Sequence, residues 1–262
     1  MEIRPAVEFS HLTYRIPDGR VLLADLNFSV AAGETLVLLG RSGSGKTTAL
    51  KLINRLLIQH DGQVLVQGKS TAEWDLIRLR RGIGYAIQDV GLFPHMTVER
   101  NVGLVPQLER WPAEKIKARV EELLELVGLP AEQYRARYPH QLSGGQRQRV
   151  GMARALAADP PILLMDEPFG ALDPLTRADI QKEFKSLQQR LAKTVVFVTH
   201  DVQEAMLLAS RIAVMDAGKL LGIFSPREFL QSKAPFVQDY TAVLRSARQV
   251  VLAGDQSEEK RL

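Results

Sequence analysis

The stretch Thr35-Leu-Val-Leu-Leu-Gly-Arg-Ser-Gly-Ser-Gly-Lys-Thr-Thr48 joins a short apolar run to a glycine-rich loop, and an apolar-periodic segment follows at residues 49–57. The apolar run predicts a buried strand, and the periodic segment predicts a helix. A strand, a glycine-rich loop and a helix in this order provide the context that a phosphate-binding loop needs. The stretch therefore predicts a nucleoside triphosphate site in an α/β protein. A chance glycine-rich turn would not be expected to lie between such a strand and such a helix.

The residue types in this loop suit phosphate binding. Its glycines let the backbone wrap around phosphates without Cβ clashes. Lys46 is expected to reach the β- and γ-phosphates, and the Thr47 hydroxyl is expected to ligate Mg²⁺. The residues expected to contact the nucleotide here are Gly40, Arg41, Ser42, Gly43, Ser44, Gly45, Lys46, Thr47 and Thr48.

A second phosphate-recognition element and an acidic strand end follow later in the chain. Residues 142–146 read Leu-Ser-Gly-Gly-Gln and open a helical pattern, so their N–H groups and the positive end of the helix dipole suit phosphate oxygens. Ile162–Met165 predict a buried strand that ends in Asp166 and Glu167. Asp166 suits a second-sphere contact to Mg²⁺, and Glu167 suits a general base that polarises the attacking water. The alternative is a strand ending in two solvated acids, which the phosphate-binding loop makes less attractive.

Three single residues are further candidates. His200 follows a buried-strand pattern at residues 194–199, and ligands of open α/β sheets bind at such strand ends. It is expected to contact the γ-phosphate and to orient Glu167 and the water. Gln88 follows another expected strand and could ligate Mg²⁺ or the water. A Gln at the end of a strand is equally often found without such a role. Tyr14 could pack in an early strand or stack on an adenine ring, and its spacing does not decide between the two.

Composition excludes several classes of protein. Of the 262 residues, 45% are hydrophobic and 24% charged, as in ordinary globular proteins. No stretch approaches the ~20 apolar residues that span a bilayer, and the N-terminus lacks the apolar core of a secretory signal. The absence of cysteine excludes disulfides, thiolate metal sites and cysteine nucleophiles. The net charge of +4 comes with charges that alternate in sign along residues 113–122, which favours solvated helix faces over a nucleic-acid partner.

Hydrophobic periodicity predicts the arrangement of elements. Strands are expected near 7–15, 21–30, 34–40, 63–67, 83–88, 162–166, 194–199 and 211–223, and helices near 46–57, 97–108, 113–127, 144–158, 175–192 and 202–209. Strands and helices alternate after residue 160, which implies parallel strands with crossovers. We expect one nucleotide-binding domain over 1–240 with a helical subdomain inserted at about 89–160. Residues 241–262 are expected to be a tail without a regulatory domain.

These motifs together resemble the ATP-binding-cassette (ABC) ATPases. The phosphate-binding loop, Gln88, Leu142–Gln146, Ile162–Glu167, Ala171-Leu-Asp173 and His200 occur in that family's order, and the likeness covers about residues 7–235. Leu-Ser-Gly-Gly-Gln is the family's own signature. The resemblance implies a P-loop NTPase cassette with a RecA-like core, an N-terminal antiparallel β-subdomain and an inserted helical subdomain.

The resemblance also implies a head-to-tail dimer of two copies. Lys46 and Thr47 of one copy and the signature of the other would enclose the same ATP. The signature residues concerned are Ser143, Gly144, Gly145 and Gln146. Asp173 would lie in a loop that couples the two sites, and Tyr14 takes the place of the adenine-stacking aromatic residue. Thr47, Gln88 and Asp166 are the residues expected at the Mg²⁺ site, Asp166 through a second-sphere contact.

A narrower resemblance concerns the cargo. Asn54–Leu56, residues 83–98 and Val105–Leu108 look like importer cassettes for glycine betaine, choline and related osmoprotectants. This implies an ATPase subunit on the cytoplasmic face of the cell membrane, with a permease whose coupling helix docks at Phe93–His95 and, indirectly, a substrate-binding protein. Ordinary subdomain core would explain Phe93 equally well.

The sequence also leaves alternatives to this cargo open. Many such cassettes carry a long C-terminal regulatory extension, which has no room after Tyr240. Another solute, such as an amino acid, stays possible because the cassette does not touch the cargo. A non-transport ABC ATPase is disfavoured by the single cassette and the lack of sustained heptads.

Overall fold

The computed structural model describes residues 4–88, 90–170 and 172–244. The strands are β1 Val7–Arg15, β2 Val21–Val30, β3 Thr35–Leu39, β4 Asp61–Val66, β5 Lys69–Ser70, β6 Ile83–Ala86, β7 Ile162–Asp166, β8 Thr194–Thr199, β9 Arg211–Asp216 and β10 Lys219–Phe224. The helices are α1 Lys46–Ile53, α2 Leu76–Arg81, α3 Val98–Val102, α4 Leu104–Leu108, α5 Ala113–Leu126, α6 Ala131–Tyr134, the 3₁₀ helix η1 Pro139–Gln141, α7 Gly144–Leu156, α8 Pro174–Leu191, α9 Val202–Leu208 and α10 Pro226–Gln231.

The larger sheet carries the expected parallel strands. Its order is β10-β9-β3-β8-β7-β6, and all neighbours are parallel except the edge strand β10, which runs antiparallel to β9. Every residue of β3, β7 and β8 is buried. Strands buried on both faces have no polar side to present, which is why these three read as continuous apolar runs in the sequence. The predicted parallel core with crossovers is confirmed.

The smaller sheet is antiparallel, with the order β2-β1-β4-β5. Phe9 of β1 stacks on Phe28 of β2 with 4.4 Å between ring centroids. One hydrophobic core joins this sheet to α1 and to one face of the larger sheet, and it includes Leu50 of α1 and Leu38 of β3. The N-terminal antiparallel subdomain is therefore packed directly on the phosphate-binding loop's strand and helix.

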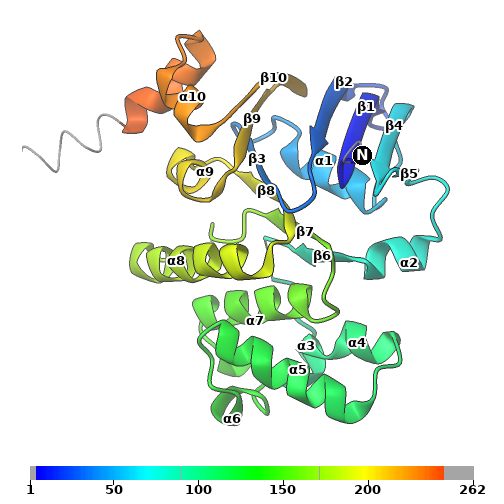
Figure 1. Cartoon of the computed structure of the whole chain (residues 1–262), viewed down its shortest axis with the longest axis vertical. Coiled ribbons are helices and arrows are strands. Elements are labelled where there is room, and N and C mark those ends of the chain that lie inside the picture. Colours follow the sequence, from blue (N-terminus) through cyan, green and yellow to red (C-terminus); the bar gives the residue numbers. More distant parts are fainter. Residues whose placement is uncertain (1–3, 89, 171, 245–262) are drawn as a thin grey trace, which may run out of the picture.

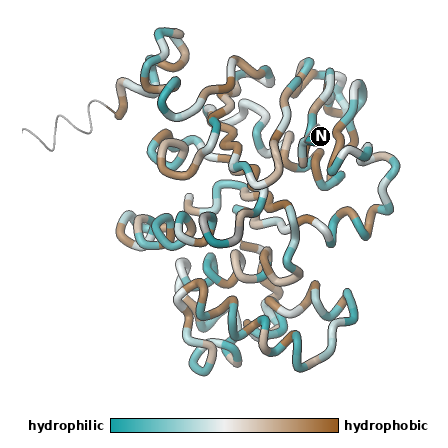
Figure 2. The backbone as a smooth tube through the Cα atoms, viewed as in Figure 1, coloured by the Kyte–Doolittle hydropathy of each residue, from teal (hydrophilic) through white to brown (hydrophobic). Residues whose placement is uncertain are grey.

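The helices between β6 and β7 form a separate group. Figure 1 shows α3 to α7 together at the lower end of the molecule, in green, below the two sheets. Hydrophilic and hydrophobic residues interchange along α5 in Figure 2, and its buried positions Val120, Leu123 and Leu124 have the spacing of one helix face. The second core joins these helices to α8, α9 and the other face of the larger sheet. This is the architecture of the predicted ABC fold class.

Three predicted elements differ from the structure. The strand expected at 211–223 is two strands, because Ala217 and Gly218 both have positive φ (44° and 78°) and form a two-residue hairpin turn. The helix expected at 97–108 is divided into α3 and α4, and Pro106 has no N–H to bond the carbonyl four residues earlier. The strand expected at 83–88 ends at Ala86, so Gln88 lies beyond the pairing with β7. The sequence prediction missed β5, α2, α6, η1 and α10, which are all short.

The C-terminal part of the described chain is helical over residues 235–244, so the first residues of the expected tail continue a helix. Residues 245–262 of that tail lie outside the described residues. The expected limits of 1–240 for the domain and 89–160 for the helical subdomain stay predictions. Within the described ranges, no helix has the length and hydrophobicity to cross a membrane.

Candidate functional site

The candidate site lies where neighbouring parallel strands end at one edge of the larger sheet. Strand β3 is next to β8, β8 is next to β7, and β7 is next to β6. Their last residues are in register, with Leu39 opposite Thr199 and Asp166 opposite Val198. The phosphate-binding loop, His200 and Glu167 directly follow three of these strand ends. Ligands of open α/β sheets bind at this edge, as expected for these residues.

The phosphate-binding loop is held around the amine of Lys46. The Nζ of this buried lysine donates hydrogen bonds to the carbonyl oxygens of Gly40 and Arg41, both at 2.8 Å. Burial lowers the pKa of Lys46, while the negative charges of Glu167 and Asp166 oppose this shift. The loop thus places a cation beside two carboxyl groups that reach it from another strand end.

Two glycines of this loop could not be replaced without strain. Gly43 and Gly45 have φ values of 81° and 96°, in the left-handed region that favours glycine. A Cβ atom on Gly45 would also lie 2.4 Å from a methyl group of Leu23 in β2. The expectation that glycine lets this backbone curve is met at these two positions.

A cavity of about 350 Å³ opens beside the loop. It is lined by Leu22, Ser42, Gly43, Gly45, Lys46, Thr47, Thr48, Gln88 and Glu167. The cavity therefore joins most of the predicted loop residues to Gln88 and Glu167, which come from two other strand ends. Ser44 is buried below the cavity and accepts a 3.4 Å hydrogen bond from Lys46.

Two hydroxyl oxygens contact the carboxylate of Asp166, and one of them belongs to Thr47, which lines this cavity. The Thr47 hydroxyl donates to Asp166 Oδ1 at 2.8 Å, and the Tyr85 hydroxyl donates to Oδ2 at 3.4 Å. Burial raises the pKa of Asp166, and the Thr47 hydrogen bond lowers it in part. A hydroxyl and a carboxylate, with the amide of Gln88 on the same cavity, are the hard oxygen ligands that Mg²⁺ prefers. Sequence reasoning missed Tyr85. The feature that could have identified it is its hydroxyl group, which is the only polar side-chain group in the strand Ile83–Ala86.

Glu167 and His200 form a pair across two adjacent strand ends. His200 Nδ1 lies 3.1 Å from Glu167 Oε2, and the glutamate side chain is 17% exposed against 56% for the histidine. Glu167 has φ 44°, an uncommon conformation for a residue with a side chain, and its N–H donates to the Val198 carbonyl oxygen at 3.1 Å. The turn is thus tied to β8 and presents the carboxylate to the cavity.

The signature residues lie outside this cavity. Ser143 caps α7 by accepting from the Gln146 N–H at 3.2 Å, and the Gln146 side chain accepts from the Ser143 N–H at 2.9 Å. All of Ser143–Gln146 is described, and none of it lines the cavity beside the phosphate-binding loop. Gly144 instead lines a neighbouring cavity of about 380 Å³, which Gln88 also lines. The structure therefore does not bring the two phosphate-recognition elements of one chain together.

Asp173 and Tyr14, two other predicted residues, lie apart from the cavity. Asp173 caps α8 by accepting from the Thr176 N–H at 3.0 Å, and this hydrogen bond holds the pKa of its exposed carboxyl below its usual value. Tyr14 lies on β1 and makes an edge contact with His60, with 5.6 Å between ring centroids. Neither lines the cavity of the phosphate-binding loop. Asp89 and Ala171, within two of the quoted motifs, lie outside the described residues.

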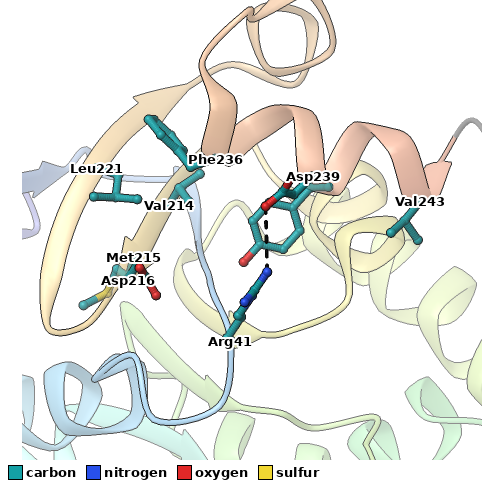
Figure 3. Close-up of a pocket in the computed structure, with 9 residues that line it drawn as sticks. Arg41, Val214, Met215, Asp216, Leu221, Phe236, Asp239 and Val243 are labelled. Carbon is teal, nitrogen blue, oxygen red and sulfur yellow. Dashed lines mark ion pairs between the residues drawn. The ribbon is translucent and has the colours of Figure 1, made fainter.

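Arg41 points away from the cavity. Figure 3 shows its guanidinium facing Asp239 of the C-terminal helix, and the ion pair measures 3.7 Å. Both side chains are largely exposed, so the pair contributes little to stability. Arg41 lines a different cavity of about 370 Å³, formed with β9, β10 and residues 236–243. The contact of Arg41 with nucleotide stays a prediction; its carbonyl oxygen, which accepts from Lys46, remains within the phosphate-binding loop.

Comparison with known proteins agrees with this geometry. A family model described as ABC transporter matches residues 23–170. The chain is 51% identical over 223 residues to the glycine betaine/carnitine/choline transport ATP-binding protein OpuCA and 50% identical to the choline transport ATP-binding protein OpuBA, both from Bacillus subtilis. Each match covers 85% of this chain and 58% of the relative, so the chain spans little more than half the length of these relatives.

A solved structure shows the same fold. The dimeric, post-hydrolysis state of the ATP-binding cassette MJ0796 bound to ADP and Pi is 35% identical to the chain, with a TM-score of 0.76. It covers 84% of this chain and 99% of that one. With the family model on more than half of the sequence and this fold around the phosphate-binding loop, the chain belongs to the ABC transporter family of ATP-binding cassettes.

Proposed function

We propose that the chain is the ATP-hydrolysing subunit of an importer for quaternary-ammonium osmoprotectants of the glycine betaine, choline and carnitine type. The observation that carries the ATPase is the cavity in which Lys46 and Thr47 face Glu167. The two Bacillus subtilis relatives at 50% and 51% identity, which are named for glycine betaine, carnitine and choline transport, support the cargo class. The alternative is an importer ATPase for another solute, such as an amino acid.

In this proposal the residues of the cavity divide the work on ATP. Lys46 binds the β- and γ-phosphates, and backbone N–H groups of the loop hold them in place. Glu167 accepts a proton from the attacking water, and His200 orients Glu167 and contacts the γ-phosphate. Thr47, Asp166 and Gln88 would hold Mg²⁺, which neutralises charge on the phosphates when it is bound. Tyr14 would stack on the adenine ring.

The second half of the site is proposed to come from another copy of the chain. In the signature Ser143–Gln146, at the N-terminus of α7, Ser143 and Gly144 are exposed and the other two residues are half-buried, and all four lie outside the chain's own cavity. Free N–H groups at this helix end suit the γ-phosphate of a partner's ATP. Asp173, exposed at the start of α8, would lie between the two sites. ATP would then hold the dimer closed until it is hydrolysed.

We further propose that a permease docks beside the cassette's helical part, at the cytoplasmic face of the membrane. A groove of about 360 Å³ lies between α2, β6, α4 and α7 and is lined by Phe93, Val105 and Arg81 among others. Phe93 is 41% exposed and makes an edge contact with His95, so part of its ring is open to a partner that enters the groove. A helix of the permease in this groove would contact the segment that follows Gln88. A substrate-binding protein would act on the permease's other side.

Uptake in the source organism tests the proposal. A strain that lacks the chain should lose ATP-dependent uptake of radiolabelled glycine betaine, choline or carnitine, and its growth in high salt should no longer respond to these solutes. Wild-type chain should restore uptake, whereas Glu167→Gln should not, although it keeps the fold. Unchanged uptake of all three solutes would contradict the cargo. Loss of uptake of a labelled amino acid instead would favour the alternative.

A further inference from the structure

Arg154, near the C-terminal end of the signature helix α7, holds the segment that follows Gln88. Its Nη2 donates to the carbonyl oxygen of Val90 at 2.6 Å, and its Nη1 donates to that of Gly91 at 2.7 Å. A planar guanidinium with two N–H groups fits two neighbouring carbonyl oxygens at once, and charge-assisted bonds of this length are strong. Arg154 is half-buried, and this burial lowers the pKa of its guanidinium.

The backbone that Arg154 holds is in an uncommon conformation. Val90 has φ 28°, and Gly91 follows with φ 56°. A positive φ is a genuine outlier for a β-branched residue and persists only where its surroundings impose it. Gly151, one turn before Arg154, provides part of these surroundings, because a Cβ atom there would lie 2.7 Å from Val90 Cγ1. The helix thus lacks a side chain where Val90 packs and supplies a guanidinium where its carbonyl oxygen points.

The following residues are held by α3 in a similar way. Asn101 is fully buried, and its Oδ1 accepts from the Phe93 N–H at 2.8 Å. Its Nδ2 donates to the carbonyl oxygens of Phe93, Met96 and Thr97 at 3.0–3.1 Å. Residues 90–97 are therefore fixed to the helical part of the molecule. Gln88, only two residues earlier, lines the cavity of the phosphate-binding loop.

We propose that Arg154 is a positioning residue that couples the place of Gln88 in the nucleotide cavity to the orientation of the signature helix α7. The inference rests on the proposed function, since Gln88 is taken to act on the ATP-bound site. Arg154 also lines the groove assigned to the permease, together with Gly91 and Phe93. Arg154 thus belongs to the signature helix, bonds the segment after Gln88 and lines the groove proposed for the permease.

The alternative is that Arg154 only stabilises the fold by bonding backbone carbonyl groups and does not affect the position of Gln88. Arg119 of α5 offers a matched control for that role. It donates to the carbonyl oxygens of Leu156 and Ala157 at the end of α7, at 3.1 Å and 3.4 Å, and it makes no hydrogen bond with the described residues 90–97. Replacing Arg119 by Lys therefore disturbs the same helix without releasing Val90 and Gly91.

The first test compares Arg154→Lys with Arg119→Lys in the full chain. Lysine keeps the charge but cannot present two parallel N–H groups. Arg154→Lys should lower kcat for ATP about 10-fold or more through misplacement of Gln88, with KM for ATP within about 2-fold of wild type. Arg119→Lys should leave both constants near wild type at a comparable change in Tm. Equal kcat values for the two variants would overturn the proposal.

The second test approaches the same contact from the other side. Gly151→Ala keeps Arg154 but pushes on Val90, so it should also lower kcat. Adding Val90→Ala removes the methyl group that the new Cβ meets and should restore most of the activity. An additive loss in the double variant, with no restoration, would contradict the coupling. Rescue of this kind is not expected if each residue contributed only to general stability.

A readout that needs no hydrolysis separates this inference from the proposed function. Backbone hydrogen exchange should rise at residues 87–93 in Arg154→Lys, while the phosphate-binding loop keeps wild-type protection, with and without ATP. Wild-type exchange throughout would overturn the inference even if the chain hydrolyses ATP. A wild-type chain that binds ATP but never hydrolyses it as a dimer would instead overturn the proposed function. In that case the difference in hydrogen exchange would still show that Arg154 holds the backbone after Gln88 in place.

Discussion

The loops at the edge of the parallel sheet and the segment at residues 90–97 are positioned by different means. The phosphate-binding loop, Glu167 and His200 follow strands whose residues are all buried and whose ends are in register. Residues 90–97 have no such strand and are held by the side chains of Arg154 and Asn101. The first group is fixed by the sheet, and the second by α7, which begins at the signature, and by α3.

This difference matches the two proposed roles, which are the hydrolysis of ATP at the sheet edge and the response to the permease at residues 90–97. Groups that contact the phosphates need a fixed geometry, which a buried sheet supplies. A segment that responds to the proposed permease has to move together with the helices that the permease contacts. The hydrogen bonds of Arg154 and Asn101 connect residues 90–97 to α7 and α3 in this way. Gln88 lies between the two kinds of region, since it lines the nucleotide cavity and also the cavity next to the signature. The following predictions test this division, beginning with the largest effect.

Glu167→Gln should give the largest effect, because it removes the proposed base at the rigid edge of the sheet. General-base catalysis contributes about 10²–10⁴-fold, so kcat should fall by roughly this factor while ATP still binds. The amide keeps the size of the side chain, and ATP should hold this variant as a dimer in analytical ultracentrifugation with Mg²⁺. A variant that hydrolyses ATP at a near-normal rate would remove Glu167 from the mechanism.

Asn101→Leu should break the hold of α3 on the second region. The substitution removes the hydrogen-bond partner of the Phe93 N–H and carbonyl groups at a partly buried site next to the fully buried Asn101, which costs about 1–3 kcal/mol in the free energy of unfolding. Asn27 is a suitable control because it also bonds backbone groups, but at the exposed surface. Urea unfolding of Asn101→Leu and Asn27→Leu should differ clearly. Similar midpoints would mean that the buried network does not matter for stability.

Tyr14→Ala should weaken nucleotide binding without changing the chemistry at the sheet edge. Loss of a stacked aromatic ring costs about 1–3 kcal/mol per base, so the Kd for ATP should rise at least about 5-fold. Tyr14→Phe keeps the ring and should bind ATP nearly as wild type, as measured by titration calorimetry. If both variants bind equally well, Tyr14 only packs against His60.

Glu204→Gln should have the smallest effect, on the pH dependence of stability. Glu204 of α9 is buried, which raises its pKa, while the Thr199 and Gln181 hydrogen bonds lower it in part. A carboxyl whose folded-state pKa is raised stabilises the fold below its unfolded pKa, and this contribution is lost as pH rises through the folded pKa. Wild type should therefore lose more stability than the variant between pH 4.5 and pH 7 in urea unfolding. An equal loss would show that Glu204 does not titrate there.

The sequence predicts the first region well and the second poorly. The buried strands and the phosphate-binding loop are encoded by contiguous residues, so apolar runs and glycines are enough to find them. Contacts such as that of Arg154 with Val90 join residues far apart in sequence, and no local sequence pattern predicts them. The hairpin at Ala217 and Gly218 was not predicted, although the charged residues Asp216 and Lys219 border this turn. Gln88 was found, but its place beyond the end of β6 was not.

Mixing two inactive variants tests the central claim that the site is shared between two copies. Lys46→Ala disables the phosphate-binding loop, and Ser143→Arg blocks the signature. In a mixed head-to-tail dimer, one of the two sites takes the intact loop of one copy and the intact signature of the other. Because half of randomly formed dimers are mixed, about a quarter of all sites should be intact, and ATPase activity should return on mixing. If the mixture stays as inactive as each variant alone, the two elements do not meet across a dimer.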